Sequence, residues 1–242
     1  MAKDSKKKSK GKHSLAKWWK WTKRIFLWLF IAQLFYILIL KWINPPITIT
    51  QLSSWISGHG LKRDYVGRNA ISRNIKLAVI SSEDQLFPDH HGFDWTSIKK
   101  AMAYNKRKPG RVRGASTISQ QVAKNVFLWQ GRSWIRKGLE IYFTFMIEKI
   151  WGKKRILQVY LNVIEMGDGI FGIEKASEIY FNKPAKNLSS QEAAMIAACL
   201  PNPKRWKVKP LSRYVAFRSR WVMLQMSLLE PDPDVQRVIK TP

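Results

Sequence analysis

The alternation of polar and apolar residues that recurs through most of the chain is clearest in one segment, Arg113-Gly-Ala-Ser-Thr-Ile-Ser-Gln-Gln-Val-Ala-Lys-Asn125. Hydroxyl and amide side chains crowd its start directly after a glycine, and apolar residues then recur at Ile118, Val122 and Val126. A spacing of three to four residues is the period of an amphipathic helix. The segment therefore predicts a helix over residues 117–129 with a polar N-terminus.

The same period continues on both sides of this segment, and strand signals are nearly absent. Ser189 and Glu192 form a capping-box pattern before one apolar run, and Pro201 stands where that helix should end. No internal repeat or long low-complexity linker interrupts residues 65–230. We therefore expect one all-α domain. Its other helices are predicted over residues 74–83, 95–104, 134–150, 155–164, 173–180, 191–200 and 213–228.

The chain is apolar enough to fold and strongly basic. Its 242 residues are 45% hydrophobic and carry 43 Lys and Arg against 16 Asp and Glu, a formal net charge of +27. This composition excludes a disordered chain and indicates an anionic partner: nucleic acid, a membrane surface or a phosphorylated ligand. The single cysteine, Cys199, excludes an internal disulfide, and its apolar neighbours indicate a small buried side chain.

The N-terminal region predicts a membrane anchor. Ten Lys and Arg within residues 1–24 precede an apolar stretch of 16 residues, 25–40. This stretch is slightly shorter than the roughly 20 residues that usually span a bilayer, but snorkelling cations and flanking tryptophans extend its reach. A cleaved signal peptide is the alternative, although no Ala-x-Ala-like site precedes Pro45. We expect a basic cytoplasmic tail (1–24), an uncleaved transmembrane helix (25–43), a linker (44–69) and a domain across the membrane (70–235).

Glu83 and Asp84 end the helical run 74–83. An acidic pair at a helix C-terminus faces the unfavourable end of the helix dipole, so its presence needs a reason. A functional site is one reason. A solvated turn in which Asp94 caps the following helix is an equally good one.

Two further segments carry candidate binding groups. The polar start of helix 117–129 could seat a phosphate or a sugar, with cations nearby at Lys124, Arg132 and Arg136, or it could be an ordinary N-cap. Glu140 is either an intrahelical partner of Arg136 or an inward functional group. The spacing of Gly167, Gly169 and Gly172 matches a dinucleotide fingerprint, but it follows a helical run, which argues against that site.

Together these segments resemble the peptidoglycan glycosyltransferases of family 51, which occur alone or as the N-terminal half of class A penicillin-binding proteins. The order and spacing of the matching segments agree with those of the family over about residues 70–205. Because a transpeptidase half is missing, the resemblance is strongest to monofunctional members. The matching segments are Glu83-Asp84-x-x-Phe87-x-x-His90-x-Gly92-x-Asp94, Gly114-Ala-Ser116-Thr117-Ile-Ser119-Gln120-Gln121-x-x-Lys124-Asn125, Arg136-Lys137-x-x-Glu140, Arg155-Ile-Leu-x-x-Tyr160-Leu-Asn162, and Glu192-Ala-Ala through Leu200-Pro-Asn-Pro203.

The resemblance implies a lysozyme-like α-helical domain with a small membrane-associated jaw. Its implied activity is polymerisation of lipid II into β-1,4-linked glycan, with release of undecaprenyl pyrophosphate by an inverting single displacement and without transpeptidase activity. The domain would lie on the periplasmic side of the bacterial inner membrane. Lipid II, a lipid-linked glycan chain and the membrane are the expected partners, and nucleic acid is not. Contacts with other cell-wall synthesis and division proteins stay open.

The resemblance also implies roles for individual residues. Glu83 would take the proton of the attacking hydroxyl, and Glu140 would orient cations around the departing pyrophosphate. Leu139 replaces a lysine that some members carry, and His91 leaves the histidine assignment open. No cofactor is required with certainty, and a Mg or Mn ion near Glu140 stays open. The expected substrate-binding residues are Asp84, His90, Ser116, Thr117, Gln120, Gln121, Lys124, Arg132, Arg136 and Lys137.

Two other functions fit parts of the sequence. A lytic enzyme of lysozyme-like fold would share the acid at the helix end, but cleavage needs no group of cations for a pyrophosphate. A non-catalytic membrane scaffold would be indifferent to Glu83→Gln. Phe127, Leu128, Trp129 and Trp134 are equally compatible with a membrane-dipping surface and with a core.

Overall fold

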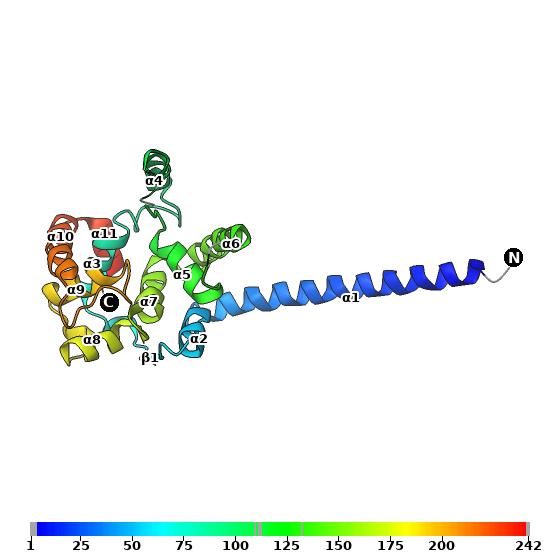
Figure 1. Ribbon diagram of the computed structural model, residues 1–242, viewed down its shortest axis with the longest axis horizontal. Coiled ribbons are helices and arrows are strands. Elements are labelled where there is room, and N and C mark those ends of the chain that lie inside the picture. The colour runs from blue at the N-terminus through cyan, green and yellow to red at the C-terminus, as the bar shows by residue number, and fades with distance from the viewer. Residues whose placement is uncertain (1–3, 109, 111–112, 132, 241–242) are drawn as a thin grey trace. The chain divides into compact units, whose positions relative to one another are not determined.

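The computed structural model of the chain describes residues 4–108, 110, 113–131 and 133–240 (Figure 1). It divides into two compact units, residues 1–43 and residues 44–242. The first unit contains one long helix, α1 (Asp4–Ile39), in which Lys17–Ile39 is long and apolar enough to cross a membrane. Large side chains such as Trp28 and Leu29 are exposed along it. The prediction of a single N-terminal candidate transmembrane helix is confirmed.

The second unit contains all eight helices that the apolar period predicted, so the all-α fold class is confirmed. Helix ends differ from the predicted ones by three residues at most. These helices are α3 (Arg73–Glu83), α4 (Trp95–Arg107), α5 (Ile118–Phe127), α6 (Trp134–Ile150), α7 (Lys153–Val163), α8 (Ile173–Phe181), α9 (Ser190–Cys199) and α10 (Arg213–Leu229).

Capping side chains determine where several of these helices begin. Asp94 caps α4 by accepting a hydrogen bond from the Ser97 amide at 2.8 Å. Ser189 and Glu192 form the predicted capping box at the start of α9. Each cap pairs backbone N–H groups that have no partner within the helix, which is why the polar residues marked these boundaries correctly.

The helices of the second unit pack in two groups. On one side α3 packs against α9 and α10, and α10 packs against α9; on the other side α5 packs against α6 and α7. Buried residues such as Ile75 and Ala78 of α3, and Val122 of α5, form the core. Helix α4 stands apart from both groups in Figure 1 and has no buried residue. The C-terminal residue of α3, Glu83, is hydrogen-bonded to Gln121 of α5, so this end of α3 connects the two groups.

Several short elements were not predicted. Helix α2 (Ile49–Ile56) begins at the capping box of Thr48 and lies, with β1 (Lys62–Arg63) and the 3₁₀ turn Arg68–Ala70, in the segment that we expected to be a linker. A second 3₁₀ turn spans Ala185–Asn187, and α11 spans Pro233–Ile239. Strands β2 (Glu165–Gly167) and β3 (Ile170–Phe171) complete a small sheet in the order β1-β3-β2, in which β1 is parallel to β3 and β2 is antiparallel to it.

The glycine-rich segment after α7 belongs to this sheet. A Cβ atom at Gly169 would lie 2.0 Å from the carbonyl oxygen of His59, and one at Gly172 would lie 2.6 Å from that of Asn162. Both glycines also have positive φ angles. These glycines therefore allow a tight hairpin to lie close to the neighbouring backbone. This structural role agrees with the interpretation that the segment is not a dinucleotide-binding site.

Candidate active site

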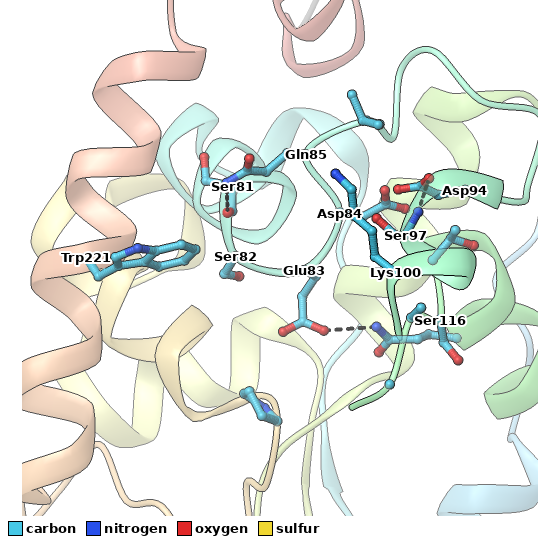
Figure 2. Close-up of a pocket in the computed structure, with 16 residues that line it drawn as sticks. Ser81, Ser82, Glu83, Asp84, Gln85, Asp94, Ser97, Lys100, Ser116 and Trp221 are labelled. Carbon is cyan, nitrogen blue, oxygen red and sulfur yellow. Dashed lines mark hydrogen bonds between the residues drawn. The ribbon is translucent and has the colours of Figure 1, made fainter. Parts of the chain in front are cut away.

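A cleft of about 880 Å³ opens at the C-terminal end of α3 (Figure 2). Its walls come from the end of α3, the loop that follows, α4, the segment that leads into α5, the first turn of α5, Pro201 after α9 and Trp221 of α10. Five of the predicted site residues line it. They are Glu83, Asp84, Ser116, Thr117 and Gln121; the remaining lining residues are Ser81, Ser82, Gln85, Leu86, Asp94, Ser97, Lys100, Gly114, Ala115, Pro201 and Trp221.

Glu83 is the last residue of α3, and its carboxylate is held from α5. The Nε2 of Gln121 donates a hydrogen bond to Oε2 of Glu83 at 2.9 Å (Figure 2). The hydroxyl of the fully buried Tyr160 in turn donates to Oε1 of Gln121 at 3.3 Å, which orients the amide with its NH₂ group toward Glu83. Helices α5 and α7 together fix the position of this carboxylate.

The surroundings of Glu83 change its acidity. Burial raises the pKa of Glu83, and the negative charge of Asp84 adds to that rise. The hydrogen bond from Gln121 and the positive charge of Arg218 act in the opposite direction. A glutamate whose pKa is moved toward neutrality is a better proton acceptor than an ordinary surface glutamate.

Asp84 ties three segments of the site together. Its buried carboxylate accepts a hydrogen bond from the Ile118 amide at 2.9 Å, and His90 Nε2 lies 3.0 Å from both carboxylate oxygens. Because the Gly92 amide donates to His90 Nδ1 at 3.1 Å, Nδ1 is the acceptor nitrogen and Nε2 carries the proton. The structure thus joins His90 to Asp84, whereas His91 is exposed to solvent.

The polar start of α5 is used mainly for capping. Thr117 Oγ1 accepts from the Gln120 amide while Gln120 Oε1 accepts from the Thr117 amide, a reciprocal capping box between two buried residues. Thr117 also donates to the carbonyl of Gly92 at 2.8 Å. Ser116, in contrast, is exposed on the cleft wall. The start of α5 is therefore an ordinary N-cap. Ser116 and Gln121 are the residues of this segment whose side chains remain available to face the cleft.

A second cluster of predicted residues lies around Glu140 on α6. Its carboxylate is 3% exposed and accepts hydrogen bonds from Arg136 at 2.8 Å and from Lys137 at 2.5 Å. Burial lowers the pKa of Lys124, with Arg136 and Lys137 adding to the effect and Glu140 opposing it. Lys124 follows Gln121 by one turn of α5, which links this cluster to the cleft. Arg132 lies outside the described residues.

The Glu140 cluster does not fit a divalent cation. Both carboxylate oxygens of Glu140 already pair with cationic groups, and the charge of Lys124 is close enough to interact. Hard cations such as Mg²⁺ need several free oxygen ligands. In the described part of the chain, no group of three or more His, Cys, Asp and Glu could hold a metal ion. The cluster is instead suited to an anion, because Arg136 Nε is a buried donor without an acceptor among the described residues.

Sequence reasoning missed several residues that build the site. Glu148 continues the buried face of Glu140 and Thr144 on α6; it accepts from Ser119 and pairs with Lys153 at 2.7 Å. The four-residue spacing of these positions was the available signal. Tyr160 stood in one of the matching segments without an assigned role. Nothing local in the sequence indicated Arg218 and Trp221, because these residues reach the site from α10.

The fold and the site define a class of protein, an all-α, lysozyme-like glycosyltransferase domain that follows a candidate transmembrane helix. The family model described as Transglycosylase matches residues 49–227, and the chain belongs to this family. It is 54% identical to a biosynthetic peptidoglycan transglycosylase of Escherichia coli over 190 residues, 77% of this chain and 78% of that protein. A protein of the same name from Citrobacter koseri is 55% identical over 182 residues, covering 74% and 75% of the two chains.

Proposed function

We propose that this chain is a peptidoglycan glycosyltransferase that polymerises lipid II into β-1,4-linked glycan strands and releases undecaprenyl pyrophosphate. One observation carries the proposal: a partly buried glutamate faces an open cleft, and the residue that fixes it, Gln121, lies one turn of α5 before Lys124, a member of a cluster of cations. The identity to proteins named biosynthetic peptidoglycan transglycosylases supports the choice of substrate.

Glu83 acts as the general base in this proposal. The attacking group is the 4-hydroxyl of the acceptor sugar, a poor nucleophile until its proton is removed. The proton passes to the Glu83 carboxylate while the hydroxyl oxygen bonds to the donor's anomeric carbon. The bond from that carbon to the pyrophosphate oxygen breaks in the same step, so the α-linked donor gives a β-linked product. Gln121 keeps the carboxylate in place throughout.

The leaving pyrophosphate carries away the bonding electron pair, so its growing negative charge must be stabilised. Lys124, Arg136 and Lys137 supply positive charge, and Arg136 Nε offers an uncommitted buried donor. Charge-assisted hydrogen bonds of this kind stabilise an anion that develops in the transition state. Glu140 holds two of these cations apart and in place by pairing with both. Arg132 stays a predicted member of the cluster.

A membrane location fits both substrates, which are lipid-linked. Helix α1 would anchor the chain with its basic end in the cytoplasm and the catalytic domain in the periplasm. The start of α6 exposes Trp134 and Ile135 by 92% and 74%, which suits contact with lipid. Further exposed apolar residues of this region are Trp129, Ile141 and Phe145, whereas Leu128 is buried and the partly buried Phe127 stacks on Phe143.

The experiment that tests the proposal uses the detergent-solubilised chain and labelled lipid II. We expect a polymer that lysozyme digests to short fragments, since lysozyme cleaves the β-1,4 linkage that the proposal predicts. Absence of polymer would contradict synthesis. Shortening of purified glycan strands by the same preparation would instead favour the lytic alternative.

A further inference from the structure

The wall of the cleft formed by α10 has no role in the mechanism above. Figure 2 shows Trp221 extending from α10 toward Ser82 and Glu83, on the side of Glu83 away from Ser116. Gln85, two residues after Glu83, donates a hydrogen bond to Gln225 of α10 at 2.9 Å. This contact fixes α10 against the end of α3, so the indole of Trp221 is held beside the proposed base.

Arg218 lies one turn before Trp221 and packs on its ring. The guanidinium carbon is 3.5 Å from the ring centroid, a close cation–π contact. The charge of Arg218 also reaches Glu83 and lowers that residue's pKa. Arg218 thus covers one face of the indole and restricts the ring to one orientation, while Trp221 still lines the cleft.

A free polar group accompanies this aromatic wall. Ser81 lines the same cleft, and its buried Oγ has no hydrogen-bond partner among the described residues. A buried hydroxyl without a partner is costly unless a ligand or water satisfies it. An apolar ring beside an unsatisfied hydroxyl matches a sugar, whose pyranose ring has apolar C–H faces and a polar rim.

We propose that Trp221, held by Arg218, is a binding platform for a sugar ring of the acceptor, with Ser81 bonding one of its hydroxyls. The inference rests on the proposed function, because Glu83 must act on that same sugar. Packing on the indole places the ring next to Glu83, so the platform sets where the attacking hydroxyl lies. Trp221 contacts the substrate, and Arg218 is a positioning residue that acts through Trp221.

Initial rates of polymerisation at varied lipid II concentration test the platform. W221L should raise KM roughly 10-fold, a loss of about 1.4 kcal/mol of binding free energy, while W221F should change KM by less than about threefold. R218Q should raise KM in the same direction, and R218K, which keeps the cation, should restore most of it. R220Q is the matched control: Arg220 is exposed on α10, two residues from Arg218, and should leave KM unchanged.

Binding without turnover separates this inference from the proposed function. Equilibrium binding of fluorescent lipid II to E83Q and to E83Q/W221L should differ by roughly 10-fold, and equal affinities together with an unchanged KM for W221L and R218Q would overturn the platform. If the wild-type chain makes no polymer but W221L still weakens lipid II binding, the proposed function fails and the platform stands. If W221L does not fold, R218Q decides the question by the same two measurements, with E83Q/R218Q as the variant for binding.

Discussion

Glu83→Gln is expected to lower kcat for lipid II polymerisation by roughly 10²- to 10⁴-fold, the usual contribution of a general base. The amide keeps the size of the side chain and can still pair with Gln121, but it cannot take a proton from the attacking hydroxyl. KM should change little, because the groups proposed to bind the substrate remain. The measurement is the initial rate of labelled polymer formation by purified wild-type and variant chains.

Unfolding should not explain this loss. Because burial raises the pKa of Glu83, the folded chain binds this proton more tightly than the unfolded chain does. The stabilisation from that proton is fully present below the ordinary pKa of 4.5 and is lost as the pH rises through the raised value. At neutral pH the variant should therefore melt at or above the wild-type temperature. Glu178→Gln, at an exposed glutamate paired with Lys175, is the matched control and should retain full activity. Polymer formation by Glu83→Gln within a few-fold of wild type would remove Glu83 as base.

Glu140→Gln is expected to reduce both stability and rate. The change leaves Arg136 and Lys137 without their common anion in a mostly buried setting, which should cost up to about 3 kcal/mol of unfolding free energy. The cations would also lose their orientation toward the pyrophosphate, so kcat should fall roughly 10²- to 10³-fold. Thermal melting and polymerisation rates measure the two effects. The exposed Glu178–Lys175 pair again provides the comparison, since removing it should cost less than about 1 kcal/mol.

A second substitution distinguishes the two roles of Glu140. The double variant E140Q/R136Q removes one uncompensated cation and should recover part of the lost melting temperature, but it should recover none of the lost rate. If the rate returned together with the stability, Glu140 would be a structural ion-pair partner and no more.

The helices of this chain were predictable because capping side chains, which act on the nearby backbone, determine where several of them begin. Asp94 and Ser189 cap the helices that follow them, and the apolar period marks the faces of α3 and α5. Helices α2 and α11 were not predicted: α2 lies in the segment interpreted as a linker, and α11 is only seven residues long and begins at Pro233. The strands are shorter still, and β1 pairs with β3, a strand distant in sequence.

The site was predictable only in part. The acidic pair at the end of α3 drew attention because it opposes the helix dipole, and Glu83 and Asp84 do line the cleft. At the start of α5, hydroxyl and amide side chains can either cap the helix or bind a ligand, and only the geometry shows that Thr117 and Gln120 cap it. The sequence could not identify Trp221 as a residue of the site, because its position at the cleft depends on how α10 packs against α3.

The dependence of kcat/KM on pH tests the role of Glu83 most directly. The charges that act on the pKa of Glu83 are those of Arg218 and Asp84, and the charge of Glu83 in turn raises the pKa of the neighbouring Tyr160 and Cys199. Since a base must be deprotonated, kcat/KM should fall on the acid side through a single pKa above 4.5, and R218Q should shift this limb to higher pH. A rate that stays constant down to about pH 4.5, or a limb at the same pH in R218Q, would contradict the assignment of Glu83 as the general base.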